Sequence, residues 1–163
     1  MLEEKLATAT KDGEDARHAS LHDSLTGLPN RALFNDRLNH ALAQAKRHGS
    51  SVVVMFLDLD DFKKINDTHG HEVGDAVLMA VGDRLREVTR NDDTVCRQGG
   101  DEFLYLLQDI RHLADIKPVS EQIINAVQAP CEIKGRDGNL NLSIQASIGI
   151  AIFPKDGSSA DGL

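Results

Sequence analysis

The chain has 163 residues, of which 27% are charged and 40% hydrophobic, and its formal net charge is −8. This length is enough for about one domain with its own buried core. The acidic balance argues against a nucleic-acid partner, which normally requires a basic face, but it does not exclude a nucleotide whose phosphates are neutralised by bound cations.

Cysteine usage and hydropathy favour a domain in the reducing cytoplasm. Cys96 and Cys131 stand alone, without the paired spacing of a disulfide framework. No run reaches the roughly 18 consecutive apolar residues of a membrane span, and no signal peptide is visible. We therefore expect a cytoplasmic domain, and a parent protein anchored in a membrane remains compatible with this.

Residues 1–22 are mostly polar, with scattered apolar side chains such as Leu2, Leu6 and Ala16. They predict a linker helix that pairs with a second copy, although Gly13 weakens any helix here. A tag or a frayed chain end is the alternative interpretation of this segment.

From residue 23 onward, helical and strand patterns interleave. Asn30 starts an amphipathic helix that Gly49 ends, and residues 52–57 form an unbroken apolar run of strand length. The further predicted elements are helices over 62–66, over 71–89 and from Pro118, and strands over 94–98, 102–107, 131–134, 139–144 and 147–153. Hairpins among these strands exclude an all-parallel sheet, so we predict an α+β fold with a mixed central β-sheet flanked by helices.

Residues 97–103, RQGGDEF, lie between two apolar runs. The glycine pair predicts a tight β-hairpin turn, because such turns need positive φ at their central residues. Asp101 and Glu102 follow directly, and two adjacent acids at a glycine turn suit a hard divalent cation and the phosphates that it carries. A solvated, acidic hairpin tip is the alternative.

A second acidic group follows the buried strand, since the apolar run 52–57 ends at Asp58. Acids at the carboxyl end of a buried strand lie at the edge of a sheet, where ligands are usually held. If this strand pairs with the hairpin, Asp58 and Asp101 can share one metal ion. Asp60 and Asp61 are interpreted as acids that start the following helix, where the helix dipole favours them.

Together with the hairpin, several further segments resemble the GGDEF domain, the catalytic module of diguanylate cyclases, which join two GTP molecules into cyclic di-GMP. The resemblance runs from about Asp23 to Gly157, and its segments are DSLTGLPNR (23–31), DLDDFKKIND (58–67), GHEVGD (70–75), RQGGDEF (97–103) and SIGIA (147–151). It implies a palm-like fold, as in adenylyl cyclases, with the motif on a β-hairpin. It also implies a GGDEF domain over residues 23–163 that lacks the usual C-terminal helix and follows a signalling helix over 1–22.

The resemblance implies a site for two-metal phosphoryl transfer. Asp58 and Asp101 are then metal ligands together with the backbone carbonyl of Leu59, and the metal is Mg²⁺ or Mn²⁺. Glu102 either binds metal or helps to deprotonate the attacking 3′ hydroxyl. Arg97 either stabilises charge on the transferring phosphate or braces the hairpin. Each domain is expected to hold one GTP, so two domains must face each other as a homodimer.

The same resemblance implies which residues recognise the substrate. Asn66 and Asp75 are expected to bind guanine, because an amide and a carboxylate complement its donors and its acceptor. Without the resemblance, both residues would be interpreted as helix caps. Lys63 is placed near the phosphates, with a solvated helix lysine as the alternative, and His71 is expected in the turn beside the guanine.

Arg90 and Asp93, in the segment before the hairpin, resemble the inhibitory site at which this family binds its product, cyclic di-GMP. Arginine can bind guanine and phosphate edges with two hydrogen bonds, and a carboxylate can accept from guanine. As an isolated pattern, the pair is a common surface ion pair.

The main prediction is a diguanylate cyclase that condenses two GTP into cyclic di-GMP and pyrophosphate. The alternative is a catalytically inactive GGDEF module that binds GTP or cyclic di-GMP and regulates an attached domain, such as an EAL phosphodiesterase. Expected partners are a second copy, an upstream sensor and a downstream EAL domain, since the local sequence also resembles GGDEF–EAL fusion proteins. A dimerising spacer would explain residues 1–22 but leaves the acids unexplained.

Overall fold

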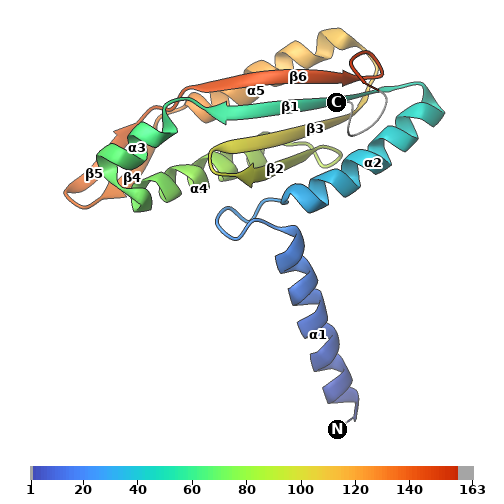
Figure 1. Cartoon of the computed structure of the whole chain (residues 1–163), viewed down its shortest axis with the longest axis horizontal. Coiled ribbons are helices and arrows are strands. Elements are labelled where there is room, and N and C mark those ends of the chain that lie inside the picture. Colours follow the sequence, from blue (N-terminus) through green and yellow to red (C-terminus); the bar gives the residue numbers. More distant parts are fainter. Residues whose placement is uncertain (1, 158–163) are drawn as a thin grey trace.

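A four-stranded antiparallel sheet forms the centre of the computed structural model, which describes residues 2–157 (Figure 1). The strands lie in the order β2-β3-β1-β6, with bounds Ser51–Leu59 for β1, Thr94–Gly99 for β2, Glu102–Ile110 for β3 and Ala146–Phe153 for β6. A separate two-stranded hairpin consists of β4, Cys131–Gly135, and β5, Gly138–Leu142.

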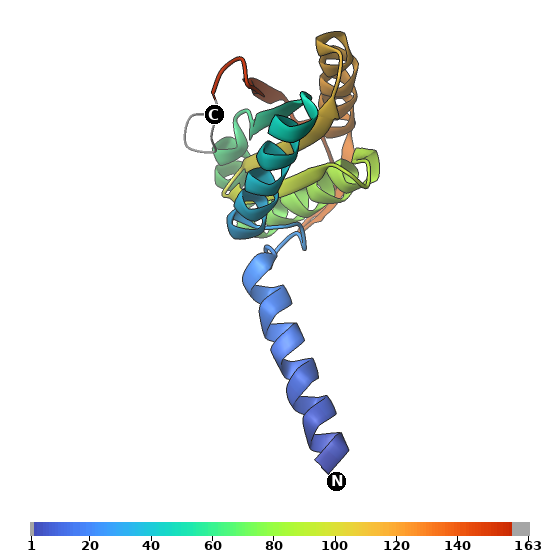
Figure 2. The same ribbon diagram turned by 90° about the vertical axis from the view of Figure 1, so that its right-hand side faces the viewer.

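Helices cover both faces of the central sheet (Figures 1 and 2). Their bounds are Leu2–Leu21 for α1, Arg31–His48 for α2, Phe62–His69 for α3, His71–Val88 for α4 and Ile116–Gln128 for α5, with a short 3₁₀ turn, η1, at Leu113–Asp115. Helix α1 stands away from this body, and none of its residues is buried. None of the helices in the described part of the chain is long and apolar enough to span a membrane.

Strand β1 is buried on both faces, as its unbroken apolar run predicts. Successive side chains of a strand point to opposite faces. Val53, Met55 and Leu57 belong to the core formed with α4 and α5, whereas Val52 and Val54 belong to the core formed with α2. The residues that α2 contributes to this second core are Phe34, Leu38, Ala41, Leu42 and Ala45. The sheet is therefore enclosed between two apolar layers.

The bounds of α2 follow from its capping residues. Asn30 precedes the helix in an extended conformation, and its side chain accepts a hydrogen bond of 3.2 Å from the N–H of Leu33. Gly49 ends the helix with φ 65°, and its N–H donates to the carbonyl of Ala45. The structure thus confirms the predicted start and end of this helix.

The α+β class is confirmed, but the prediction of a mixed sheet is wrong for the described strands. Every pairing in the central sheet is antiparallel, because β3 and β6 both run opposite to β1 between them. Burial on both faces, which is typical of parallel strands, results here from helices on both sides of an antiparallel sheet. The strand expected over 139–144 is β5, and it pairs with β4 outside the central sheet.

Candidate functional site

Glycine conformations shape the turn between β2 and β3. Gly100 and Asp101 are the two loop residues, and the flanking Gly99 and Glu102 pair across the hairpin. Gly100 has φ 53° and Gly99 has φ 149°, both in the region that favours glycine. A Cβ atom at either position would meet no atom within 4 Å. Backbone conformation, rather than lack of space, is therefore what requires glycine here.

The register of β1 against β3 brings the acids of the two segments together. Asp58 lies directly opposite Glu102, and the N–H of Leu59 donates to the carbonyl of Asp101 over 3.3 Å. Partial loss of hydration, followed by repulsion from Asp101 and Glu102, raises the pKa of the Asp58 carboxyl. The structure therefore places Asp58 beside Asp101, while their role as metal ligands stays a prediction.

The oxygen donors at this end of the sheet fit a hard divalent cation. Asp58, Asp101 and Glu102 supply carboxylates, and no basic side chain among the described residues forms an ion pair with them. Residues 2–157 contain no group of three or more His, Cys, Asp or Glu side chains arranged as metal ligands. A Mg²⁺ or Mn²⁺ ion would therefore need further oxygen donors, such as the backbone carbonyl of Leu59 or a substrate phosphate.

Asp60 has a different role from the one its sequence position indicates. Its carboxylate accepts hydrogen bonds from the hydroxyl of Ser147 at 2.8 and 3.1 Å, and its N–H donates to the carbonyl of Gln145. Asp61 has φ 57° and makes no capping hydrogen bond with its side chain. Asp61 nevertheless occupies the N-terminal capping position of α3, as expected of an acid that starts this helix, whereas Asp60 ties the end of β1 to β6. Ser147 lies in one of the segments that carried the family resemblance, but nothing in the sequence indicated this contact.

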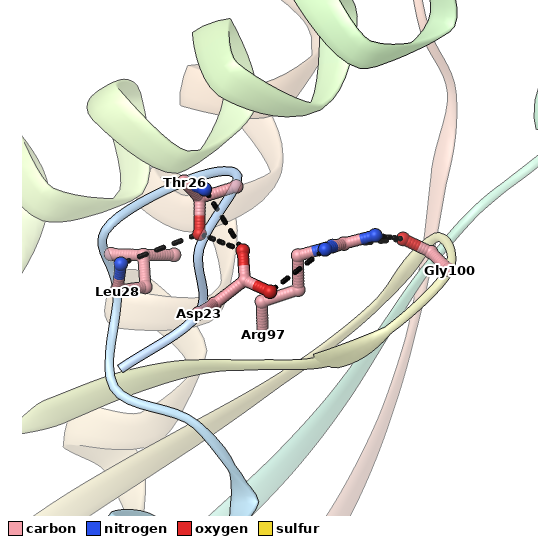
Figure 3. Close-up of polar contacts among 5 residues, drawn as sticks. All are labelled: Asp23, Thr26, Leu28, Arg97 and Gly100. Carbon is pink, nitrogen blue, oxygen red and sulfur yellow. Dashed lines mark hydrogen bonds and ion pairs between the residues drawn. The ribbon is translucent and has the colours of Figure 1, made fainter. Parts of the chain in front are cut away.

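The side chain of Arg97 points toward Gly100 in the hairpin turn (Figure 3). Its Nη1 forms an ion pair of 2.9 Å with Asp23, and its Nε and Nη2 donate to the carbonyl of Gly100 at 3.1 and 2.9 Å. Thr26 also donates to Asp23 from its N–H and its hydroxyl. Although burial opposes ionisation, these hydrogen bonds and the charge of Arg97 hold the pKa of Asp23 below its usual range. These contacts hold Arg97 against the hairpin turn, while its role toward a transferring phosphate stays a prediction.

Asn66 and Asp75 come from two consecutive helices that meet at Gly70. A Cβ atom on Gly74 would lie only 1.8 Å from Oδ1 of Asn66, so the amide of Asn66 rests against the first turn of α4, next to Asp75. Both residues lie inside their helices, at 62–69 and 71–88, so neither caps one. Lys63 and His71, exposed in the first turns of the same two helices, complete this group of predicted substrate residues.

The acids open onto a pocket of about 370 Å³ that Asp58 and Glu102 line together with Phe56, Leu104 and Arg31. Phe56 is 44% exposed there, on the face of the sheet that α2 covers elsewhere. A larger cavity of about 750 Å³ lies between α2 and the loop before β2, beside the predicted product site. The acidic site therefore has a partly apolar wall, but it is not the largest hollow of the described structure.

The predicted product-site residues form an ion pair in the structure. Asp93 accepts hydrogen bonds from Nε of Arg90 at 2.8 Å and from the N–H of Gln108 at 3.1 Å, and its side chain is only 2% exposed. The side chain of Arg90 is 61% exposed. The carboxylate of Asp93 is thus satisfied within the protein, and Arg90 is the member of the pair that is open to a ligand.

Comparison with known protein families agrees with this geometry. Residues 20–163 match the family model described as "Diguanylate cyclase, GGDEF domain". The chain belongs to the GGDEF domain family. The family and the α+β fold that the sequence predicted are therefore confirmed.

Among curated proteins, the bifunctional diguanylate cyclase/cyclic di-GMP phosphodiesterase MucR of Pseudomonas aeruginosa is 43% identical over 144 residues, 88% of this chain and 20% of MucR. The diguanylate cyclase TpbB of the same species is 40% identical over 162 residues, 99% of this chain and 37% of TpbB. The chain thus spans about a fifth of the first relative and somewhat over a third of the second.

Solved structures show the same fold. The GGDEF domain of TpbB has a TM-score of 0.80 at 44% identity, over 87% of this chain and 81% of that structure. The coiled coil and GGDEF domain of DgcB from Caulobacter crescentus, solved in complex with c-di-GMP, has a TM-score of 0.79 at 30% identity, over 96% of this chain and 86% of that structure. These likenesses confirm the predicted GGDEF fold.

Proposed function

We propose that this GGDEF domain condenses two molecules of GTP into cyclic di-GMP and pyrophosphate. The observation that carries the proposal is the placement of Asp58, at the end of β1, beside Asp101, at the tip of the hairpin. The name of TpbB, a diguanylate cyclase, and the c-di-GMP in the DgcB structure support it. Because the substrate GTP is a cytoplasmic metabolite, we place the domain in the cytoplasm.

In the proposed reaction the 3′ hydroxyl of each GTP attacks the α-phosphorus of the other, so that two phosphodiester bonds form and two molecules of pyrophosphate leave. Asp58, Asp101 and the carbonyl of Leu59 would hold Mg²⁺ or Mn²⁺, which when bound stabilises negative charge on the transferring phosphate. Glu102 lies opposite Asp58 at the same end of the sheet and accepts the proton of the attacking hydroxyl. Lys63, exposed in the first turn of α3, binds the phosphates.

The group of Asn66 and Asp75 binds guanine in this proposal. The carboxylate of Asp75 accepts from the N–H donors of guanine, while the amide of Asn66 both donates and accepts. His71, at the start of α4, lies in the turn beside the base. The amide of Asn66 lies close to Gly74, which restricts its orientation. The amide therefore presents its donor and acceptor in the arrangement that selects guanine over adenine.

Two copies of the domain act together, since cyclic di-GMP contains two equivalent linkages and each domain binds one GTP. Helix α1 buries none of its residues against the rest of the chain, and Leu2, Leu6, Ala9, Gly13 and Ala16 follow one another at alternating spacings of four and three. This spacing suits a paired helix with small side chains along the seam. The DgcB structure likewise contains both a coiled coil and a GGDEF domain.

Arg90 and Asp93 form a product site in which the two residues have different tasks. Asp93 holds Nε of Arg90 and the backbone of Gln108, and the exposed guanidinium binds the guanine or phosphate of cyclic di-GMP. The ion pair therefore orients Arg90 before the ligand arrives, which lowers the entropic cost of binding.

The second candidate function is regulation of an attached domain by bound nucleotide, without catalysis. MucR, of which this chain spans 20%, combines cyclase and phosphodiesterase functions in its name, so an EAL phosphodiesterase domain and an upstream sensor are proposed partners of the parent protein. Product formation from GTP separates the two candidates, because a regulatory module binds nucleotide but makes no cyclic di-GMP.

Asp101→Asn should abolish formation of cyclic di-GMP from GTP and Mg²⁺ while the fold stays intact, because it removes one charged metal ligand. The measurement is chromatography of the nucleotides formed from GTP, both by the 163-residue chain and by the parent protein. The control is Asp83→Asn, which removes an exposed carboxylate from α4 and should leave turnover unchanged. Wild-type turnover by folded Asp101→Asn would falsify the proposed site, and absence of product from both wild-type forms would favour the regulatory module.

Gly74→Ala should lower the affinity for a non-hydrolysable GTP analogue about threefold to tenfold, because the new methyl group displaces the amide of Asn66 and weakens its hydrogen bond to guanine. Calorimetric titration measures this affinity, and thermal denaturation checks the fold. Gly13→Ala is the control for the added methyl group, since a Cβ atom at Gly13 meets no atom of the same chain within 4 Å and α1 lies outside the proposed guanine site. If folded Gly74→Ala binds the analogue with unchanged affinity, Asn66 does not take part in guanine recognition.

Specific activity should rise with protein concentration until the dimer saturates, because each phosphodiester bond needs two domains. The measurement is turnover over a wide dilution range, accompanied by sizing of the same samples. A constant specific activity in samples that are monomeric by sizing would contradict the dimeric mechanism.

Arg90→Ala should weaken binding of cyclic di-GMP about tenfold or more, because it removes a charged donor able to make two hydrogen bonds. Calorimetric titration with cyclic di-GMP and inhibition of GTP turnover report on the same site. Lys117→Ala, which removes an exposed cation 3.9 Å from Glu121 on α5, is the control. Equal affinity and equal inhibition in Arg90→Ala and wild type would mean that Arg90 and Asp93 are only a surface ion pair.

A further inference from the structure

A chain of polar contacts joins the segment after α1 to the tip of the acidic hairpin (Figure 3). Asp23 lies two residues beyond the end of α1 and forms an ion pair with Arg97, 74 residues further along the chain. Arg97 in turn donates to the carbonyl of Gly100 from two of its nitrogens. Two distant segments of the sequence are thus connected directly beside the acids.

The contact with Gly100 constrains Asp101. The carbonyl of Gly100 belongs to the peptide unit that ends in the N–H of Asp101, and this unit is planar. Two donors from one rigid guanidinium, at 3.1 and 2.9 Å, hold that carbonyl in one direction. The orientation of the peptide plane limits where the side chain of Asp101 can point, and Gly100, with φ 53°, has the freedom to adopt other conformations without this restraint.

The ion pair is itself fixed from the other side. Asp23 accepts from the N–H and the hydroxyl of Thr26 at 2.9 and 2.7 Å, and its own N–H donates to the carbonyl of Leu28 at 2.7 Å. The N–H of Arg97 donates to the carbonyl of Pro29 at 3.1 Å. The side chains of Asp23 and Arg97 are only 15% and 14% exposed, so solvent screens this pair less than a surface ion pair.

We propose that Asp23 and Arg97 are positioning residues of the acidic site, which hold the hairpin turn in the conformation that places Asp101 beside Asp58. The inference rests on the proposed metal-binding role of these two acids, and it assigns Arg97 to the preparation of the site rather than to contact with the transferring phosphate. Outer groups that orient metal ligands commonly contribute about tenfold or more to metal affinity.

A purely electrostatic role of Arg97 predicts the opposite sign of effect. A cation near a metal site repels the metal, so its removal should strengthen binding if charge alone matters. Loss of positioning should weaken binding, although a positive charge has been removed. The direction of the change in affinity therefore distinguishes the two roles.

The test is a titration of the 163-residue chain with Mn²⁺ alone, in which the signal of free Mn²⁺ in electron paramagnetic resonance gives the affinity. Arg97→Ala should weaken Mn²⁺ binding about tenfold. Arg97→Lys should also weaken it, because one ammonium group cannot serve both Asp23 and Gly100 as a planar fork does. The paired variant Asp23→Asn with Arg97→Gln leaves the net charge unchanged and should weaken binding to a similar extent.

Arg31→Ala is the control for charge. Arg31 lines the same pocket as Asp58 and Glu102, but it donates its hydrogen bonds to Asn35 and Gln98 and not to the turn residues Gly100 and Asp101. Its removal should leave Mn²⁺ affinity unchanged or strengthen it. Thermal denaturation of each variant shows whether the fold is retained, and the variants with Lys or Gln at position 97 keep the test available if Arg97→Ala fails to fold.

Wild-type affinity in folded Arg97→Lys and in the paired variant, or tighter binding in Arg97→Ala, would overturn the positioning role. Absence of Mn²⁺ binding by the wild type would overturn the metal site and this inference with it. Weaker Mn²⁺ binding in the variants, combined with a wild type that makes no cyclic di-GMP, would support the positioning role and reject the proposed catalytic function.

Discussion

The register between β1 and β3 is the constraint on which the acidic site depends. Asp58 stands opposite Glu102 because six consecutive pairs, from Val53 with Leu107 to Asp58 with Glu102, are aligned in the same register. A shift by one residue would turn Asp58 to the other face of the sheet, since side chains alternate along a strand. The apolar residues of β1 resist such a shift, because Val53, Met55 and Leu57 would leave one core for the other. Packing in the middle of the sheet thus determines the chemistry at its end.

Repulsion among the carboxylates of the acidic site lowers the stability of the folded domain. The pKa of Asp58 is raised, so the folded protein holds this proton more tightly than the unfolded chain does. Ionisation as the pH rises through the folded-state pKa therefore disfavours the folded state at this position. A bound cation would remove the repulsion among Asp58, Asp101 and Glu102. The buried neighbours Leu57, Leu59 and Phe103 keep the strands together while these charges remain close.

Local sequence patterns predicted most of the fold, whereas contacts between distant segments escaped them. The helix from Asn30 to Gly49, the buried strand and the hairpin each have a signal within a few residues, in the form of caps, apolar runs or glycines. The ion pair of Asp23 with Arg97 and the bond from Ser147 to Asp60 join residues 74 and 87 positions apart. Periodicity shows which face of a strand is buried but not which loop folds back onto it, and the antiparallel order of the sheet was missed for the same reason.

Asn30 shows how few contacts connect α1 with the rest of the domain. Its backbone N–H donates to the carbonyl of Leu21, its side-chain Nδ2 donates to the carbonyl of Ser20, and its Oδ1 accepts from the N–H of Leu33 at the start of α2. One residue therefore binds the last turn of α1 and the first turn of α2. Because α1 buries none of its residues, it is connected to the domain by these hydrogen bonds and by the chain segment that follows it and contains Asp23. Asp23 and Pro29 of that segment both bind Arg97. The connection between α1 and the acids therefore consists of hydrogen bonds rather than a packed interface.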